Sequence, residues 1–339
     1  MSVAIAYDDR FLDHDMSGHP ESSGRLRAIK AKLESTGQMA RLPRLEPRMA
    51  TEKEVLLAHE SELIAEVKGH TARGGGWVDS DTYVNAGSWE VALLAAGAAI
   101  QAAERVWAGD HESAFVLSRP PGHHATQRRA MGFCLLNNVA IAARVLRESH
   151  GVKRLAIVDF DVHHGNGTQD IFWSDPSVLY MSTHQYPYYP GSGHWSETGD
   201  RDGAGTSVNA SLPAYCGDLQ YARVFDEVFD AVIRRYKPEL ILVSSGFDSH
   251  ENDPLAMQQV TTQGYVALAG RVKSWADELC SGKLAFVLEG GYDYVALGEG
   301  VSGILDMLEG TPWSDSGRGA DGPDISPLIE KLREAHNLP

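Results

Sequence analysis

Cysteine is scarce in this chain of 339 residues. The three cysteines, Cys134, Cys216 and Cys280, are widely spaced and form no C-x-x-C pair, which argues against a disulfide framework and a thiolate zinc site. The N-terminal segment also lacks a basic region followed by a long apolar run, because Asp8 and Asp9 interrupt it early. We therefore expect a cytoplasmic protein in a reducing compartment, without a membrane-spanning segment.

Basic residues are also in short supply. Lysine and arginine total 30 against 46 acidic residues, and the formal net charge is −16 at pH 7. Binding to a nucleic-acid backbone requires clusters of Lys and Arg, so we expect no nucleic-acid partner. A cationic substrate would suit this charge better. The hydrophobic fraction of 43% and the charged fraction of 22% are typical of an ordinary globular enzyme.

Short apolar runs alternate with longer helical patterns along the chain. This alternation predicts an α/β fold in which helices cover a parallel sheet. The predicted strands are apolar runs that end near Gly, Pro or Asp: Val3–Tyr7, Ser113–Leu117, Leu155–Val158, Val178–Met181, Leu240–Ser244 and Leu284–Leu288. The predicted helices carry apolar residues at three- and four-residue spacing: Ser88–Val106, Asn137–Arg147, Leu219–Tyr236, Thr262–Leu279 and Val295–Leu308. No linker or repeat divides the chain, so we predict a single domain over residues 1–339.

Most of the unusual residues lie in loops that follow predicted strands. These loops are Arg119–Arg129, Asp159–Gln169, Ser182–Gly193, Ser245–Pro254 and Glu289–Asp293. In open parallel sheets the ligand crevice lies outside the carboxyl ends of the strands. We therefore expect the five loops to converge at one edge of the sheet and to carry the chemistry.

One of these loops contains an Asp-x-His pair. Alternate residues of an extended segment share a face, so Asp161 and His163 should lie side by side. Asp248, which follows another apolar strand, offers a third ligand. Two carboxylates and one imidazole satisfy a catalytic zinc ion, which takes three protein ligands and keeps one position open. The same set would also accept Fe(II), Co(II) or Mn(II).

Two further loops contribute candidate acid, base and donor groups. The adjacent His123 and His124 follow a Pro-Gly turn. Tyr292 follows the Gly290-Gly291 pair, where glycine lets the backbone approach a ligand closely. Taken alone, the histidines would be interpreted as structural and Tyr292 as a core aromatic. Their expected arrival at the same sheet edge as the metal ligands favours a metal-dependent hydrolase.

Taken together, these motifs resemble those of the zinc-dependent histone deacetylase superfamily, and in particular its class II-like bacterial branch. The resemblance covers nearly the whole chain, through segments in the family's order: His19-Pro20-Glu21, Asp81-Thr82-Tyr83, Arg119–Ala125, Gly132-Phe133-Cys134, Asp159–Gly167, Tyr189-Pro190-Gly191, Gly246-Phe247-Asp248 and Glu289–Asp293. Each motif is weak alone, whereas the ordered set is specific. The resemblance implies an arginase-like, three-layer α/β/α fold around a mainly parallel central sheet, with one Zn2+ per chain.

The resemblance also implies a role for each residue of the site. Asp161, His163 and Asp248 would bind zinc, in agreement with the argument from strand ends. Tyr292 would donate its hydroxyl to the substrate carbonyl opposite the metal, where a tetrahedral oxyanion needs stabilisation. The tandem histidines would handle the protons of the attacking water and of the departing amine.

The two histidines differ in the partners that the resemblance implies. His123 would pair with the carboxylate of Asp159, which favours a charged imidazolium, whereas His124 would pair with Asn166, which adds no full charge. We therefore hypothesise that His123 stays cationic and that His124 is the neutral base and later the acid. Class I relatives carry aspartate in place of Asn166, so the asparagine supports the class II-like assignment.

The family further implies a monovalent cation, K+, beside the metal. Its ligands would be Asp159, the Ser182 hydroxyl and the main-chain carbonyls of Asp161, His163 and Thr183. A second such cation, bound mostly by main chain, is implied more weakly near Phe172, Asp175, Val178 and Thr206. Without the resemblance, Ser182 would be interpreted as a simple hydroxyl at the end of a strand.

Aromatic residues would line a channel to the metal. Phe133, which follows Gly132, and Tyr189 match the family's two channel walls, although Tyr188 could exchange roles with Tyr189. Such walls suit an uncharged aliphatic stem that leads to an amide, as in acetyl-lysine. Leu255 occupies the position of the gate, where polyamine-selective eukaryotic relatives carry glutamate. We therefore expect an acetyl-lysine peptide or protein as substrate.

Several alternatives stay open. An acetylated polyamine, or another small N-acyl metabolite, would suit the negative charge. The loop residues Asp79, Asp81, Glu197 and Asp200 could form an acidic rim for it, although solvated loop charges are the commoner explanation of such residues. A dinuclear manganese hydrolase is less favoured, because no second aspartate follows Asp248 at two-residue spacing. A catalytically silent acetyl-lysine-binding protein would not need the complete set of ligands, acid and base. The oligomeric state is also open, with a homodimer among the options.

Overall fold

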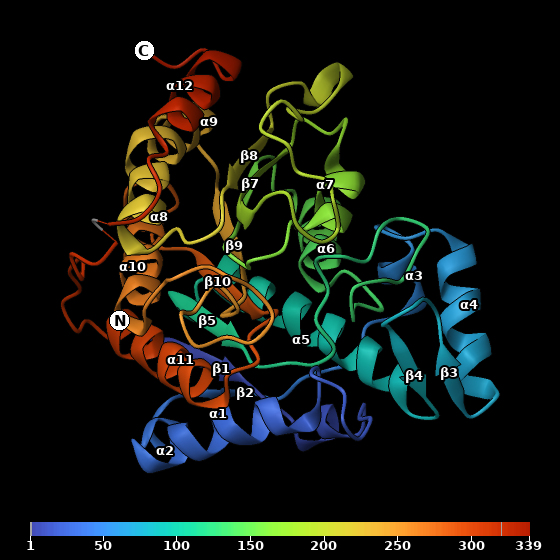
Figure 1. Ribbon diagram of the computed structural model, residues 1–339. Helices are drawn as coiled ribbons and strands as arrows, with labels where there is room; N and C mark the ends of the chain where they lie inside the picture. The colour runs from blue at the N-terminus through green and yellow to red at the C-terminus, as the bar shows by residue number, and fades with distance from the viewer. Residues whose placement is uncertain (1, 320) are drawn as a thin grey trace.

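A β-sheet of eight strands forms the centre of the computed structural model, which describes residues 2–319 and 321–339 (Figure 1). All neighbouring strands in it run parallel. From edge to edge the order is β2 (Arg44–Leu45), β1 (Val3–Ala6), β5 (Ser113–Val116), β10 (Leu284–Leu288), β9 (Leu240–Ser245), β6 (Leu155–Asp159), β7 (Val178–Gln185) and β8 (Ser207–Leu212). The predicted α/β class is confirmed, and the sheet is parallel throughout rather than only mainly parallel.

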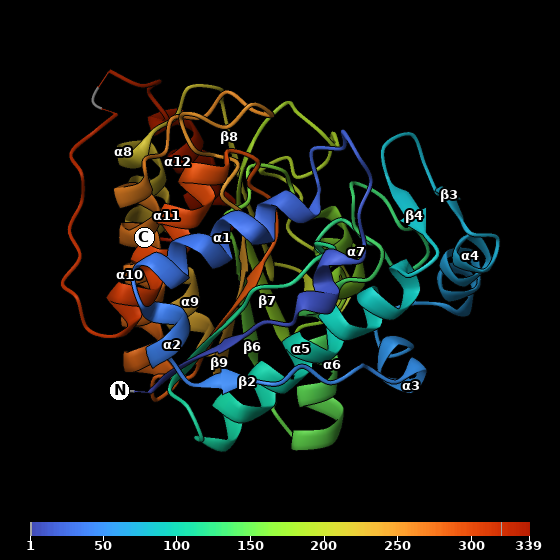
Figure 2. The same ribbon diagram turned by 90° about the horizontal axis from the view of Figure 1, so that it is seen from below.

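Helices cover both faces of this sheet. Every residue of the central strands β10 and β9 is buried, as expected for parallel strands that are enclosed on both sides. On one side lie α1 (Ser23–Ser35), α10 (Thr262–Leu279) and α11 (Tyr294–Leu308), and on the other lie α5 (Ser88–Ala108) and α6 (Asn138–His150) (Figure 2). The three-layer α/β/α arrangement therefore follows the prediction.

The remaining elements surround these layers. The other helices are α2 (Gln38–Arg41), α3 (Glu52–Val55), α4 (Ser61–Ala72), α7 (Asn166–Phe172), α8 (Asp218–Val224), α9 (Asp230–Tyr236) and α12 (Ser326–Ala335). An antiparallel hairpin of β3 (Gly75–Trp77) and β4 (Tyr83–Asn85) lies beside α4 at the periphery (Figure 1). Three short turns complete the chain: the 3-10 turns η1 (Asp9–Leu12) and η2 (Arg201–Gly203), and the π-helical turn η3 (Phe225–Phe229).

Helix α5 is, within the described residues, the one helix that is long and apolar enough to cross a membrane. Its apolar stretch is 72% buried inside the protein. The helix packs against α6 and against β5 and β10. Burial in the core thus accounts for its hydrophobic character.

The prediction of the loop Ser182–Gly193 was wrong at its start. Strand β7 continues to Gln185, because Ser182–Gln185 pairs with β8, which the sequence reasoning did not find. In β8, polar Ser207, Asn209 and Ser211 alternate with apolar residues, so it contains no continuous apolar run. Strand β6 likewise extends one residue further than predicted and includes Asp159.

The predicted helix Leu219–Tyr236 is confirmed in extent, but it is not a regular α-helix throughout. The chain there forms α8, the π-helical turn η3 and then α9, so the regular hydrogen-bond spacing is interrupted in the middle. Apolar side chains at three- and four-residue spacing do not distinguish this interruption from a regular helix, since π-helical turns usually occur as short insertions within α-helices. The extent and the amphipathic pattern of the helix were therefore predicted correctly, whereas the π-helical turn was not predicted.

Strand order determines which loops meet. The strands β5, β10, β9 and β6 are direct neighbours, although they are far apart in sequence. The loops after them carry the tandem histidines, Tyr292, Asp248 and the Asp-x-His pair, respectively. All four loops therefore leave the same edge of the sheet side by side, as the rule for ligand crevices in parallel sheets requires.

Candidate metal centre and active site

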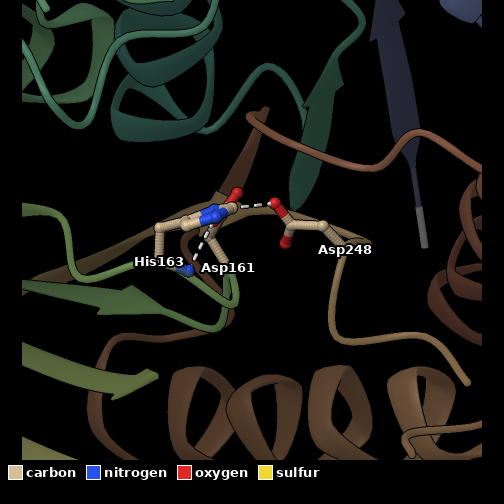
Figure 3. Close-up of side chains that lie close together, drawn as sticks. All are labelled: Asp161, His163 and Asp248. Carbon is tan, nitrogen blue, oxygen red and sulfur yellow. Dashed lines mark hydrogen bonds and ion pairs between the residues drawn. The ribbon is translucent and has the colours of Figure 1, made fainter. Parts of the chain in front are cut away.

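Asp161, His163 and Asp248 converge at this edge (Figure 3). One potential ligand atom of each lies within 4.8 Å of those of the others. The His163 Nδ1 atom is 3.2 Å from Asp161 Oδ1 and 3.2 Å from Asp248 Oδ2. Asp161 and His163 come from the segment after β6, and Asp248 comes from the loop after β9. The predicted ligands thus point toward one another across two adjacent strands.

Neighbouring backbone holds the two carboxylates in place. Asp161 Oδ2 accepts the N–H of Gly290 at 2.8 Å, and Asp248 Oδ1 accepts the N–H of Val162 at 2.8 Å. A methyl group on Gly246 would collide with the Asp161 carboxylate, and one on Gly290 would collide with both carboxylates. Glycine at these two positions therefore makes room for the acidic pair.

The electrostatics of the triad favour a bound cation. Burial lowers the pKa of His163, but the carboxylates of Asp161 and Asp248 have the larger combined effect and raise this pKa to about 10. Burial and the proximity of Asp161 raise the pKa of Asp248, so two buried carboxylates repel each other here. A divalent metal would compensate this repulsion and replace the proton on the imidazole. The donor set, one nitrogen and two oxygens, fits a catalytic metal of the zinc type.

The tandem histidines lie beside the triad and are both buried. His123 Nδ1 is 3.1 Å from Asp159 Oδ2, and His124 Nδ1 is 2.8 Å from Asn166 Oδ1. Because an amide oxygen only accepts hydrogen bonds, His124 Nδ1 carries its proton, which leaves Nε2 free as a base. The partners implied for the two histidines are therefore the ones that the structure places next to them.

The charges of the two histidines differ in the direction that we hypothesised. Burial lowers the pKa of His123, but the carboxylates of Asp161 and Asp159 have the larger combined effect and raise this pKa to about 10. Burial, with the positive charges of His123 and His163, lowers the pKa of His124 well below its usual value. At neutral pH this arrangement gives a cationic His123 and a neutral His124.

These shifts predict the pH dependence of activity. A base acts only without its proton, so kcat/KM should rise with pH as His124 deprotonates, with half of the maximum reached below pH 6.5. It should fall again on the alkaline side, where His123 loses its charge, because Asp159 and Asp161 raise the pKa of His123 above its usual value. The measurement is a kcat/KM profile from pH 5 to 10.5 at saturating metal. A half-maximum on the acidic side above pH 7 would contradict the assignment of His124 as the base.

Tyr292 stands on the side of the site formed by the loop after β10. Burial raises the pKa of its hydroxyl well above the usual value, so the group stays protonated and can donate a hydrogen bond. The guanidinium of Arg25 lies 5.0 Å from the centre of the Tyr292 ring, and the Phe133 ring lies 6.0 Å from it.

Three residues around the site were missed by the sequence reasoning. Arg25 donates to the carbonyl oxygens of Glu289 and Gly291. The carboxylate of Glu289 accepts the N–H groups of Gly122 and His123 at 2.6 and 3.1 Å. Asp253 accepts the N–H of Tyr292 at 2.6 Å. Asp253 and Glu289 lie in loops that the sequence had singled out, whereas the signal for Arg25 is its position four residues after Glu21, with which it forms an ion pair.

A cavity of about 260 Å³ leads to the triad. It contains nearly every residue predicted for catalysis or substrate binding, and its lining comprises Asp81, Pro121, His123, His124, Gly132, Phe133, Asp161, His163, Tyr188, Tyr189, Leu255, Gly290 and Tyr292. Of the predicted residues, Asp248, Asp159 and Asn166 lie behind this lining and contact His163, His123 and His124, respectively.

Tyr188 and Tyr189 both line the cavity and differ in how they contact its histidines. The Tyr188 ring is stacked on His163, with ring centres 5.7 Å apart, and its hydroxyl donates to the Leu255 carbonyl at 2.5 Å. The Tyr189 ring stands edge-on to His124, with ring centres 5.2 Å apart. Tyr188 and Tyr189 therefore both stand near the metal ligand His163, and which of them acts as the channel wall stays a prediction.

Gly132 allows His124 and Tyr189 to approach each other. A methyl group there would lie 2.5 Å from His124 Cδ2 and 2.9 Å from the Tyr189 hydroxyl oxygen, and the glycine has φ of +57°. Gly132→Ala should therefore displace His124 and lower kcat by roughly a hundredfold, since small displacements of reacting groups have effects of that size. Steady-state kinetics would check this, with Gly87→Ala, which meets no crowding, as the control.

The acidic rim is smaller than expected. Asp81 lines the cavity, but Glu197 does not. The Glu197 carboxylate instead accepts hydrogen bonds from Gln169, from the N–H of Gly193 and from the N–H of His194. Asp200 lies outside the lining and caps the turn η2. Glu197 therefore holds a loop.

The proposed ligands of the monovalent cations remain a prediction. Asp159 and Ser182 lie opposite each other on β6 and β7. The Ser182 hydroxyl is 2.8 Å from His184 Nδ1, and the Thr183 hydroxyl has no hydrogen-bond partner among the described residues. At the weaker second site, Asp175 pairs with Arg144 and Arg147.

Comparison with known proteins gives consistent matches over nearly the whole chain. The family described as "Histone deacetylase domain" matches residues 19–308. A "Probable deacetylase" of Archaeoglobus fulgidus is 41% identical over 295 residues, which cover 86% of this chain and 82% of that protein. A "Histone deacetylase-like amidohydrolase" of Pseudomonas aeruginosa is 37% identical over 277 residues, which cover 81% and 73%. The crystal structure of the HDA15 HD domain matches with a TM-score of 0.89 and 35% identity, covering 98% of this chain and 95% of that one.

Proposed function

This chain belongs to the histone deacetylase family and is a deacetylase or amidohydrolase of that family, and from this premise we propose that it hydrolyses the amide of acetyl-lysine in a peptide or protein. The observation that carries the proposal is the cavity, which leads between aromatic walls to the triad and has Leu255 in its lining. An uncharged aliphatic stem that ends in an amide fits such a cavity, because its methylene groups can pack against the rings.

The proposal includes a divalent metal at Asp161, His163 and Asp248, with Zn2+ as that metal and one ion per chain. When bound, it supplies a Lewis acid that polarises the substrate carbonyl and activates a water molecule. We also propose K+ beside it, with Asp159 and Ser182 among its ligands. The opposite positions of these two residues on β6 and β7 support this assignment.

The reaction converts an acetylated amine and water into acetate and an ammonium group. In the proposal His124 Nε2 takes one proton from the attacking water and passes it to the amine nitrogen as the C–N bond breaks. The second proton of the water is left on the acetic acid, which is a stronger acid than the ammonium group and so transfers it to the amine. The Tyr292 hydroxyl donates to the carbonyl oxygen, where negative charge develops. His123, held by Asp159, supplies a fixed positive charge beside this region.

An acetylated polyamine is the second candidate substrate, and Asp81 is the observation that favours it. Asp81 lines the cavity, and burial together with the carboxylate of Asp79 raises its pKa. A cationic amine near the mouth would relieve this repulsion between carboxylates. The net charge of −16 would attract such a substrate as well.

A panel of kcat/KM values decides between the candidates. The zinc-loaded protein would be assayed with acetyl-lysine peptides, acetylputrescine, acetylspermidine and longer acyl-lysines, with Tyr292→Phe as the control for background hydrolysis. We expect the peptides to be preferred and the variant to lose nearly all activity. A strong preference for acetylated polyamines would overturn our first choice. Equal activity of the variant would overturn the proposed mechanism.

A further inference from the structure

Asp253 is a buried carboxylate that connects two loops of the site. It is 7% exposed and lies in the loop between β9 and α10. Its Oδ1 accepts the N–H of Leu255 at 3.0 Å, and its Oδ2 accepts the N–H groups of Tyr292 at 2.6 Å and Asp293 at 3.2 Å. Among the described residues no Lys, Arg or His forms an ion pair with it. Three backbone N–H groups are thus its hydrogen-bond partners.

A carboxylate with such surroundings requires an explanation. Burying a charged or polar group is costly unless hydrogen bonds compensate, and a hydrogen bond from an N–H group to a carboxylate is among the stronger kinds. The bond to Leu255 is local and orients the carboxylate, together with the bond from the Asp253 N–H to the His250 carbonyl at 2.8 Å. The bonds to Tyr292 and Asp293 reach a loop 39 and 40 residues away.

The segment before Tyr292 depends on such external support. Gly290 and Gly291 have no side chains with which to anchor themselves, and Gly291 has φ of +115°. The Gly290 carbonyl instead accepts the N–H of Phe247 at 3.0 Å, and the Gly291 carbonyl accepts Arg25 Nε at 2.7 Å. The next backbone donor along the chain is the Tyr292 N–H, and Asp253 is its acceptor.

The other oxygen of Asp253 acts on the gate. Leu255 lines the cavity, its N–H donates to Asp253, and its carbonyl accepts the Tyr188 hydroxyl. One carboxylate therefore connects the backbone of the gate to the backbone of the tyrosine that faces the substrate carbonyl in the proposed mechanism. The loops after β7, β9 and β10 form one hydrogen-bonded wall.

We propose that Asp253 is a positioning residue that fixes, through these backbone N–H groups, where the Tyr292 hydroxyl and the Leu255 side chain stand in the cavity. This inference rests on the proposed function, because it takes Tyr292 as the donor to the substrate carbonyl. In this proposal Asp253 does not contact the substrate itself. It acts through Tyr292 and Leu255, which line the cavity.

The test is a cycle of the single variants Asp253→Asn and Tyr292→Phe and their combination, assayed as zinc-loaded proteins on the preferred acyl-amine substrate. Asparagine keeps the shape of the side chain but turns an N–H donor toward an N–H group. We expect Asp253→Asn to lower kcat by about ten- to a hundredfold, with KM changed by less than about threefold, because Tyr292 is displaced. In the Tyr292→Phe background it should cost less than about threefold, because no hydroxyl remains to be positioned.

Additive losses in this cycle, or an unchanged kcat in Asp253→Asn, would overturn the inference. An unchanged kcat in Tyr292→Phe alone would instead overturn the role of Tyr292 in the proposed function, so the two failures are distinguishable. If Asp253→Asn does not fold, Asp253→Ser enters the same cycle. Asp218→Asn is the matched control, because Asp218 is equally buried and accepts the N–H of Thr261 at 2.8 Å outside the cavity. It should lower the melting temperature and leave kcat within about threefold.

Discussion

Asp248→Asn should leave the protein without bound metal and reduce kcat/KM by at least about a thousandfold. The substitution removes one of the two anionic ligands, and a neutral amide binds a divalent cation far less strongly. Loss of the Lewis acid removes several kcal/mol of transition-state stabilisation, which corresponds to losses of about that size. The measurements are metal content per chain by elemental analysis and kcat/KM on the preferred substrate.

A comparison of metal-free Asp248→Asn with the metal-free parent distinguishes loss of metal binding from loss of folding. Burial and Asp161 raise the pKa of Asp248, so the neutral asparagine relieves a repulsion that exists without metal. The melting temperature of metal-free Asp248→Asn should therefore equal or exceed that of the metal-free parent. Asp277→Asn, which removes an exposed partner of Lys273, is the control and should bind metal normally. Full metal content in Asp248→Asn would contradict the assignment of the ligand.

His124→Ala should lower kcat by about a hundred- to ten-thousandfold while the metal stays bound. This range is typical for removal of a general acid or base. The side chain is not a member of the metal-binding group, so the metal content should not change. The loss should be smaller at high pH with substrates whose leaving amine is less basic, because such amines depart with less help from an acid. Steady-state kinetics and elemental analysis would check each point.

His123→Ala is the comparison that tests the difference between the two histidines. It removes a buried positive charge between Asp159 and Asp161, so we expect a lower melting temperature and a smaller loss of kcat than in His124→Ala. Equal and small losses of kcat in the two variants would rule out the division of roles. A larger loss of kcat in His123→Ala than in His124→Ala would indicate that His123, and not His124, is the base.

The Asp-x-His pair and the tandem histidines show what local sequence can predict. Asp161 and His163 are two residues apart in an extended segment, so their proximity follows from backbone geometry. The strands β5, β6, β9 and β10 were also predictable from their apolar runs, because strands enclosed on both faces are apolar throughout. Strand β8 was missed because its alternation of polar and apolar residues lacks that signal.

The sequence by itself therefore determined the α/β class, the residue types of the candidate metal ligands and the two-residue spacing of Asp161 and His163, because each depends on groups that are close along the chain. Tertiary structure alone decided that β5, β10, β9 and β6 are neighbours, that Tyr188 rather than Tyr189 stacks on His163, and that Asp253 reaches Tyr292. These contacts join segments that are distant in sequence. They depend on the sum of many weak packing and hydrogen-bonding terms, which no single motif encodes.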